Sequence, residues 1–378
     1  MPHDPTADQR FFQMTTREFL AGTVPTETVR ALADAGTGFD RDWWRRGAEL
    51  GWTAMLVPES LGGGSVSGHP MTELALVAEE LGRAAAPGPF VTTTAALAGL
   101  RATADHLAET VAAIVAGTLL VTWAVYEPGA GFGVLTGEAG GTRAVPAGSG
   151  YRLTGVKDRV EAADQADLFL VTATGPDGPI QLLVPAETPG VTVSPTWTID
   201  LSRRTGKVVF DDVVVGTDAV THSGAAAVAA VRAQAGAAAL VTAAESAGAA
   251  EHALTRTLTW LFERYTFGRP LASYQSLKHR MADNKTWLEA CRATVFAAAA
   301  AWDAEAPETD EYISIAKSYV GAKAPVIAQD CVQLHGGIGV TWEHDLHLFL
   351  RRITLGRALY GTPEEHRRHI TDLLDSAA

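Results

Sequence analysis

Cysteine is scarce in this chain, which has only Cys291 and Cys331 among its 378 residues. Two thiols are too few for a disulfide framework or for a zinc site built on cysteine. Both lie in apolar stretches with helical spacing, so we expect two small buried side chains. The sequence therefore excludes a disulfide-stabilised scaffold, and the chain is long enough to bury a substantial hydrophobic core.

Basic residues are too few and too scattered for a nucleic-acid binder. Lys and Arg number 30 against 43 Asp and Glu, which gives a formal net charge of −13 at pH 7. The only basic clusters are four Arg-Arg pairs, at 45–46, 203–204, 351–352 and 367–368. We therefore expect neither nucleic acid nor an anionic membrane surface as a partner.

No segment has the composition of a secretory signal or of a membrane span. The first ten residues include acids and contain no apolar run. The longest apolar stretch, 224–250, is mostly alanine and is interrupted by Arg232, Gln234 and Glu245, whereas a span needs about 20 strongly apolar residues. These features predict a soluble, cytoplasmic protein.

Paired histidines are the one hint of a metal site. His344 and His347 stand three residues apart, as do His366 and His369, so each pair could share one face of a helix. No pair of carboxylates stands at ligand spacing in the same pattern. The sequence predicts no metal site.

Three zones of different texture follow one another along the chain, whose length allows two or three domains. Residues 1–118 are predicted to be helical, and the run at 71–86 is a strong helix in which Gly82 marks a stop or a point of close packing. Residues 119–222 contain six short β-branched runs, which are typical of an antiparallel barrel or sandwich.

The third zone, residues 223–378, returns to helix. Helices are expected at 224–264, 275–302, 308–335 and 343–357. The order of helices, then strands, then helices argues against Rossmann and TIM-barrel layouts, in which strands and helices alternate. The predicted fold is mostly α with a central β domain.

Two breaks in the third zone offer groups that can bind phosphate. Arg264 ends the long helix, where its guanidinium could pair with a phosphate or could simply complement the helix dipole. At Gly336 and Gly337, backbone amides could face a pyrophosphate, or the two glycines could form a plain helix–helix turn. The residues alone leave these alternatives open.

Six segments spread over the chain carry motifs: AELGW (48–52), AVYEPGAGF (124–132), GVKDRVEAADQADLFLV (155–171), RYTFGRPLASYQSLKHRMAD (264–283), QLHGGIGVTWEH (333–344) and LYGT (359–362). The most specific are Arg-x-x-Phe-Gly-x-Pro and Gln-x-x-Gly-Gly-x-Gly. With these motifs the chain resembles the acyl-CoA dehydrogenase family over nearly its whole length. The resemblance implies an N-terminal helical domain (1–118), a middle β-barrel (119–222) and a C-terminal four-helix bundle (223–378). It also implies α,β-dehydrogenation of an acyl-CoA thioester with FAD.

The resemblance further implies a set of residues that hold the FAD of a neighbouring subunit. The set comes from the two breaks in the third zone and comprises Arg264, Thr266, Phe267, Tyr274, Gln275, Gln333, Gly336 and Gly337. We therefore expect an FAD shared across a subunit interface, and a dimer or tetramer formed with a copy of this chain or with a related catalytic subunit.

The chain departs from the family at the catalytic base. The reaction needs a carboxylate that removes a proton next to the thioester. The family places this Glu before the Gly-Thr of the last motif or on the long helix, and here those positions are Tyr360 and Ala238. A phenol with an ordinary pKa of about 10 is a poor base at pH 7. Glu245 is nearby but is expected on a different helix face, so the usual positions provide no catalytic residue.

The positions that face the flavin ring within one subunit are altered as well. The family has small hydroxyl residues where this chain has Tyr126 and Phe132, and its Trp-x-Thr is replaced by residues 159–161, Arg-Val-Glu. A bulky ring and a carboxylate are poor substitutes for hydrogen bonds to a flavin. The remaining candidates for cofactor contact on this side are weaker, namely Glu127, Gly129 and Arg159.

The residues that the resemblance implies for the flavin of a neighbouring subunit are thus present, and those implied for a flavin within the same subunit are mostly replaced. This combination resembles bacterial family members that lack the catalytic Glu and act in heteromeric complexes, often on bulky thioesters such as sterol side chains. Two alternatives stay open: an enzyme that uses the fold for other flavin chemistry such as oxygenation, and a flavin-free binding or scaffold subunit. The sequence does not indicate the acyl group.

Overall fold

The N-terminal part of the chain is helical, as the sequence predicts. The computed structural model describes residues 4–101 and 105–377, so residues 1–3, 102–104 and 378 of the expected domains lie outside it. A capping box formed by Thr6 and Gln9 begins the first helix. The helices are α1 (Ala7–Thr23), α2 (Thr26–Ala35), α3 (Arg41–Glu49), α4 (Pro70–Arg83), α5 (Phe90–Leu100) and α6 (Ala108–Val115), with 3-10 turns η1 (Glu59–Leu61) and η2 (Asp105–Leu107).

The middle part forms one eight-stranded sheet, which confirms the expected central β domain. Its strands are β1 (Val121–Ala124), β2 (Arg143–Ala147), β3 (Gly150–Glu161), β4 (Leu168–Gly175), β5 (Gly178–Pro185), β6 (Val191–Thr196), β7 (Thr205–Gly216) and β8 (Val220–Ser223), with 3-10 turns η3 (Phe132–Leu135) and η4 (Thr217–Ala219). The hydrogen-bonded order is β6-β7-β3-β2-β4-β5-β8. Most pairs are antiparallel, whereas β1 and β2 each run parallel to β4.

The C-terminal part is a helix bundle whose bounds lie within a few residues of those expected. Its helices are α7 (Gly224–Glu263), α8 (Gln275–Asp303), α9 (Thr309–His335), α10 (Leu346–Ala358) and α11 (Pro363–Ala377). A small hairpin of β9 (Tyr265–Thr266) and β10 (Arg269–Pro270), followed by η5 (Leu271–Ser273), joins α7 to α8, and η6 (Gly336–Val340) follows α9.

Helix α7 is the central element of the bundle. Its 40 residues include an 18-residue window with a mean hydropathy of 1.4, so by length and composition it could cross a membrane, which corrects the expectation from its sequence. In this structure 56% of that window is buried, as in the core helix of a soluble protein. The helix packs against α4, α5, α8, α9 and α10.

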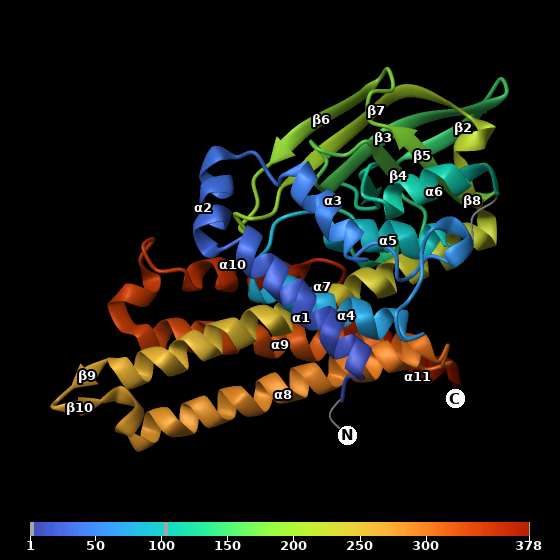
Figure 1. The fold of residues 1–378 in the computed structure, drawn as a ribbon. Coiled ribbons are helices and arrows are strands. Elements are labelled where there is room, and N and C mark those ends of the chain that lie inside the picture. The colour runs from blue at the N-terminus through green and yellow to red at the C-terminus, as the bar shows by residue number, and fades with distance from the viewer. Residues whose placement is uncertain (1–3, 102–104, 378) are drawn as a thin grey trace.

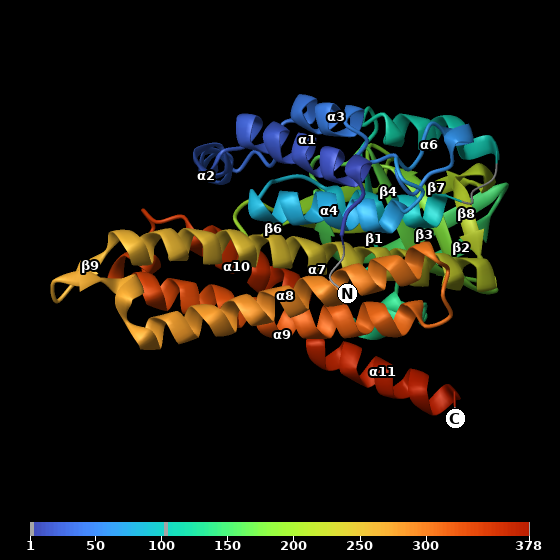
Figure 2. The ribbon, with the colours of Figure 1, turned by 60° about the horizontal axis from the view of Figure 1, so that its bottom comes forward.

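The crossing of α4 and α7 is a point of very close approach. A Cβ added to Gly82 would lie 2.0 Å from the carbonyl oxygen of Glu245, and one added to Gly248 would lie 1.9 Å from that of Glu79. Gly82 is thus a point of close packing, one of the two roles expected for it. In Figure 2, α4 lies between α1 and α7, so this crossing joins the N-terminal helices to the bundle.

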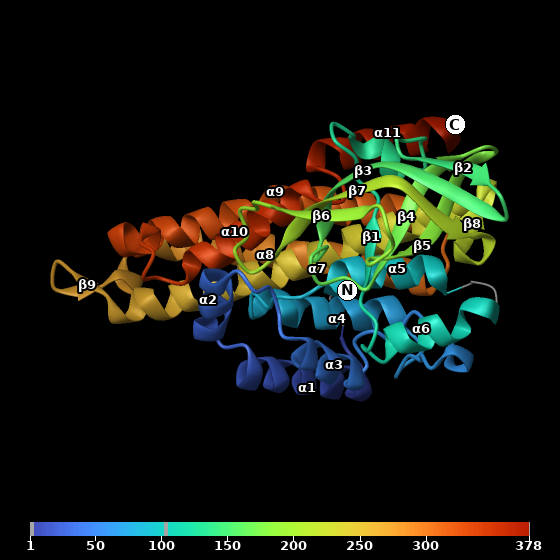
Figure 3. The ribbon, with the colours of Figure 1, turned by 90° about the horizontal axis from the view of Figure 1, so that it is seen from above.

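The three parts form layers around α7. Figure 1 shows the sheet over one half of the bundle, with the β9–β10 hairpin at the opposite end. Seen from above, α1 and α3 lie on one side of the bundle and α11 on the other (Figure 3). The long bundle therefore presents two distant regions, one beside the sheet and one at the hairpin.

Candidate functional site

The first group of predicted cofactor residues lies in the turn between α7 and α8. Arg264 leaves the helix, and its N–H donates to the Trp260 carbonyl at 2.9 Å. The hairpin turns at Phe267, which has a φ of 52° and is 93% exposed. A positive φ is strained for a bulky residue, and the Phe267 ring is held almost fully in solvent.

The second group lies at the end of α9, beside the first. The residue after the helix, Gly336, has a φ of 66° and a ψ of −142°, a conformation that glycine tolerates best. Gln333, Gly336 and Gly337 are exposed, and a Cβ on either glycine would meet nothing within 4 Å. The His335 ring stacks on Trp260 with 5.2 Å between centroids, so the two groups meet at one end of the bundle.

The positive charge of Arg264 is not neutralised by an acid within the described part of the chain. Arg264 is exposed, forms no ion pair there, and places its guanidinium carbon 5.9 Å from the centroid of the Trp260 ring. Tyr274 donates its hydroxyl hydrogen to the Thr266 carbonyl at 2.8 Å, and its ring lies 3.9 Å from the Arg269 guanidinium. Tyr274 therefore stiffens the turn, and Gln275 is the exposed first residue of α8.

The region beside the sheet contains Tyr360, at the position where the resemblance implied a catalytic carboxylate. Tyr360 is buried and has a φ of 55°. Its N–H donates to the Tyr126 hydroxyl at 2.6 Å, and its carbonyl lies 2.9 Å from Nε2 of His366. Lys317 donates to the carbonyls of Gly356 and Gly361 at 3.0 and 2.7 Å. These contacts hold a strained backbone, so the placement of Tyr360 is tightly determined.

The side chain of Tyr360 fills space between the sheet and the bundle. Its ring is parallel to that of Trp123, with centroids 6.4 Å apart and an interplanar angle of 3°. The Tyr126 ring lies 6.1 Å away, and the Arg159 guanidinium covers Tyr126 at 4.3 Å. Burial raises the pKa of the Tyr360 phenol well above its ordinary value. The phenol therefore stays protonated near neutral pH and does not act as a base.

Glu127, a weaker cofactor candidate, has its oxygens occupied within the chain. It accepts hydrogen bonds from Lys157 Nζ at 2.7 Å, from the Thr142 N–H at 3.0 Å and from the Gly141 N–H. Burial opposes ionisation, but Lys157 and the Thr142 hydrogen bonds lower the pKa of Glu127 to about 2. The exposed Gly129 has no neighbour within 4 Å of an added Cβ.

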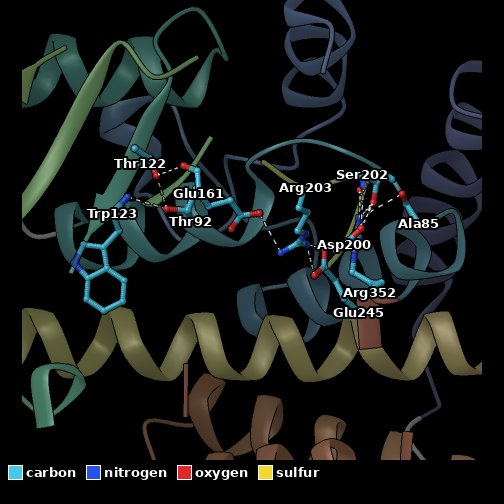
Figure 4. A network of polar contacts seen from close by, with 11 residues as sticks. Ala85, Thr92, Thr122, Trp123, Glu161, Asp200, Ser202, Arg203, Glu245 and Arg352 are labelled. Carbon is cyan, nitrogen blue, oxygen red and sulfur yellow. Dashed lines mark hydrogen bonds and ion pairs between the residues drawn. The ribbon is translucent and has the colours of Figure 1, made fainter. Parts of the chain in front are cut away.

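A buried ionic network that the sequence did not reveal lies beside Tyr360. It joins Glu161 at the end of β3, Asp200 and Arg203 in the segment between β6 and β7, Glu245 on α7 and Arg352 on α10 (Figure 4). Arg203 Nη1 lies 3.0 Å from Glu161, and Arg203 Nη2 donates to Glu245 at 2.5 Å. Each of these residues is at most 5% exposed.

Arg352 binds Asp200 and connects this network to the end of α4. It donates to Asp200, to the Ser202 hydroxyl at 2.6 Å and to the Ala86 carbonyl at 2.8 Å. Burial opposes ionisation of Asp200, but Arg352 and Arg203 lower its pKa. Because Ala86 follows α4, the network ties the N-terminal helices, the sheet and the bundle to one another.

The position of Glu245 corrects the expectation that it faces away from Ala238. Seven residues correspond to about 700° of helical rotation, so Glu245 lies on nearly the same face of α7, about 10 Å further along. Its carboxylate is bound by Arg203 and is 2% exposed. Glu245 is therefore a structural anion, which leaves it unavailable as a base. The one sequence signal of this role was a lone charge in an alanine-rich run.

A cavity of about 320 Å³ opens next to Tyr360. Its walls include Phe132, Ala239, Ser314 and His366. Two acids line it, Asp310 and Asp372, and both are exposed to solvent. Burial is what raises the pKa of a general base in such a pocket, so neither acid has the environment that the reaction needs.

The histidines expected to share helix faces take part in packing. His366 and His369 both lie against Phe132, at 5.2 and 5.6 Å between ring centroids. Burial lowers the pKa of His366 to about 3. Over the ranges 4–101 and 105–377, no three His, Cys, Asp or Glu side chains gather as a metal site.

Comparison with known proteins agrees with this architecture. A model of the acyl-CoA dehydrogenase N-terminal domain matches residues 6–117, and a model of the acyl-CoA dehydrogenase C-terminal domain matches residues 228–374. The chain belongs to the acyl-CoA dehydrogenase family. The resemblance in the sequence is thereby confirmed.

Several relatives of this acyl-CoA dehydrogenase family member are known. It is 29% identical to the acyl-CoA dehydrogenase IpdE2 of Mycobacterium tuberculosis, with 97% of each chain aligned. A variant of the Tcur3481–Tcur3483 steroid acyl-CoA dehydrogenase is 30% identical, with a TM-score of 0.86 over 98% of each chain. A complex of ChsE4 with ChsE5 from Mycobacterium tuberculosis matches at 26% identity, with a TM-score of 0.88 over 99% of each chain.

The family uses flavin, and the two regions of this chain fit a flavin to different degrees. At the hairpin end, the Arg264 guanidinium, which has no ion pair among the described residues, and an open glycine turn match the chemistry of a pyrophosphate. Beside the sheet, Tyr360, Trp123 and Tyr126 pack together, and Glu161 and Arg203 form a buried ion pair. The residues at the hairpin end therefore fit the cofactor, whereas those beside the sheet are aromatic rings packed on one another and a buried ion pair, which offer few free hydrogen-bonding groups to a flavin ring.

Proposed function

We propose that this chain is the subunit of a heteromeric acyl-CoA dehydrogenase that lacks the catalytic base and completes the FAD site of a related subunit. The observation that carries the proposal is the contrast between the two regions. The end of the bundle exposes an unpaired Arg264, and the position of the base holds a buried Tyr360.

The proposal assigns a separate task to each group at the hairpin end. Arg264 would pair with the pyrophosphate of an FAD held mainly by the partner, and Gly336 and Gly337 would let the backbone approach it closely. Phe267, at 93% exposed, would be buried by that partner. FAD, when bound, supplies the hydride acceptor, and the partner supplies the carboxylate base.

The heteromeric arrangement is supported by the nature of the relatives. Two of the solved structures reported above carry the names of two different proteins. We extend this feature to the present chain and propose a related subunit as its partner. We also propose an acyl-CoA thioester as the substrate of the complex and the cytoplasm as its location.

The test is flavin retention by the complex after co-expression with a related subunit that carries the catalytic Glu. Arg264→Ala removes one charge-assisted contact, which is worth about 1.5–3 kcal/mol, or a tenfold to hundredfold loss in flavin affinity. The matched control is Arg368→Ala, which removes an exposed arginine of α11. Wild-type flavin content in Arg264→Ala would remove the cofactor role of Arg264 and most of the case for this function.

The same preparations discriminate the two alternatives. Bound flavin in the chain purified alone would favour other flavin chemistry within this subunit. A complex without flavin would favour a scaffold role. Flavin that appears only in the complex supports the proposed function.

A further inference from the structure

The buried network beside Tyr360 has more acids than bases. Glu161, Asp200 and Glu245 face Arg203 and Arg352, so the fully ionised cluster carries a net charge of −1. All five side chains are shielded from solvent. A net charge in such a place is costly, and a buried acid that lacks a full set of partners takes up a proton.

The three acids are held very unequally. Asp200 accepts from the Ser202 N–H at 3.0 Å and from the Ser202 hydroxyl at 2.7 Å, in addition to the Arg352 guanidinium. Glu245 receives Nη2 of Arg203 on both of its oxygens. Within the described residues, Glu161 has one ion contact, at 3.0 Å, and neither of its carboxylate oxygens has a hydrogen-bond partner. Glu161 is therefore the acid that the network stabilises least as an anion.

Two cavities give water a route towards this carboxylate. One, of about 10 Å³, is lined by Glu161 and Arg203 and is about the size of a single water molecule. The other, of about 140 Å³, shares Arg203 with the first and reaches the exposed Trp197. The two cavities thus provide space for water next to Glu161 and next to the Arg203 side chain that faces it.

We infer that Glu161 is a proton-binding site at the junction of the three domains, and that it takes up one proton near neutral pH and so cancels the charge excess of the network. The groups that face it are Arg203, Asp200, Glu245, Arg352 and the Tyr360 phenol. Burial, which outweighs the attraction of Arg203, raises the pKa of this carboxyl to about 7, in agreement with the geometry.

Protonation of Glu161 is then coupled to folding of the chain. The unfolded chain releases this proton at an ordinary pKa of about 4.5, so between pH 5 and 7 the folded state binds more protons than the unfolded state. Stability from this group is present at low pH and is lost as the pH rises towards 7. This inference does not depend on the proposed function, because it concerns the chain in the absence of a cofactor.

The experiment compares the unfolding constants of wild type and Glu161→Gln between pH 5 and 9. Gln keeps the shape and leaves two acids against two bases. The ratio of the wild-type constant to that of the variant is expected to rise about fortyfold in total between pH 5 and 7, and to level off above pH 8. The matched control, Glu49→Gln, removes a carboxylate of an exposed ion pair and should track wild type at each pH.

A constant ratio across this range would overturn the inference. Glu161→Thr serves as the neutral variant if Glu161→Gln does not fold. Infrared spectroscopy gives a direct readout, because the difference spectrum between wild type and Glu161→Gln at pH 6 should contain the band of one protonated carboxyl, over and above that of Glu79, whose pKa burial also raises to about 7. Selective stabilisation by Na⁺ or K⁺ over tetramethylammonium at constant ionic strength would also overturn it, since a metal cation would then be what neutralises the network.

Discussion

Replacement of Gly248 by alanine should increase the separation of α4 and α7 where they cross and destabilise the chain. The added Cβ would lie 1.9 Å from the Glu79 carbonyl oxygen, an impossible contact with backbone that cannot rotate away. Alanine in a helix interior normally adds about 0.5–1 kcal/mol of stability relative to glycine, whereas overpacking a tight contact costs about 1–3 kcal/mol or more. Since both helices are buried here, we expect the upper end of that cost and a net loss of about 2 kcal/mol.

The loss should extend to two buried ionic networks. The methyl group of Gly248→Ala meets the carbonyl of Glu79, whose carboxylate pairs with Arg292 at 3.0 Å. At the same crossing, a methyl group at Gly82 would meet the carbonyl of Glu245, whose carboxylate pairs with Arg203. A shift of either helix therefore strains an ion pair as well as the packing. Gly82→Ala acts at the same crossing, so its cost in the Gly248→Ala background should be smaller than in wild type.

Urea unfolding monitored by circular dichroism measures these differences. The matched control is Gly22→Ala, because Gly22 lies in α1 and an added Cβ would meet nothing within 4 Å. That variant should equal wild type or exceed it by up to about 1 kcal/mol. Equal stabilities for Gly248→Ala and Gly22→Ala, or additive losses in the double variant, would refute the reasoning.

Two further predictions concern the region beside the sheet. Tyr360→Glu should destabilise the chain by several kcal/mol and confer no acyl-CoA oxidation, because the new carboxylate is buried near Glu161 and Glu245. Tyr360→Phe should fold normally, since the backbone N–H at this position makes the hydrogen bond to Tyr126. Flavin reduction by an acyl-CoA with Tyr360→Glu would contradict this prediction. Lys157→Met leaves Glu127 buried and unpaired and should cost about 3–5 kcal/mol. Because the pKa of Glu127 is lowered to about 2, its contribution to folding stability is full above pH 4.5 and is lost as the pH falls towards 2. Glu127→Gln should therefore flatten that part of the pH–stability curve. Parallel curves for wild type and Glu127→Gln would count against the ion pair.

The sequence predicted the elements better than the contacts between them. The helices at 71–86 and 224–264 were evident because Ala, Leu and Glu favour helix and because long apolar periodicity persists into the folded state. The hairpin-end residues were implied by motifs that resemble the family, and the structure brings them to one end of the bundle; their role towards a cofactor stays a prediction.

The network around Arg203 was not predictable in the same way. Glu161, Arg203, Glu245 and Arg352 come from four elements, and a charge in sequence is most often a solvated surface group. The burial of these charges depends on the tertiary fold, which brings the four side chains together. Tyr360 was identified as a departure from the family, but its strained backbone and its stack on Trp123 appear only in the structure.

The most direct test of the proposed function is a count of flavin in the co-purified complex. We predict no flavin in the chain alone and one FAD per pair of different subunits, because beside the sheet this chain places the packed rings of Tyr360, Trp123 and Tyr126. Light scattering on the same sample gives the number of subunits and should exceed the mass of one chain. Two FAD per pair, or a chain that retains flavin by itself, would contradict the account.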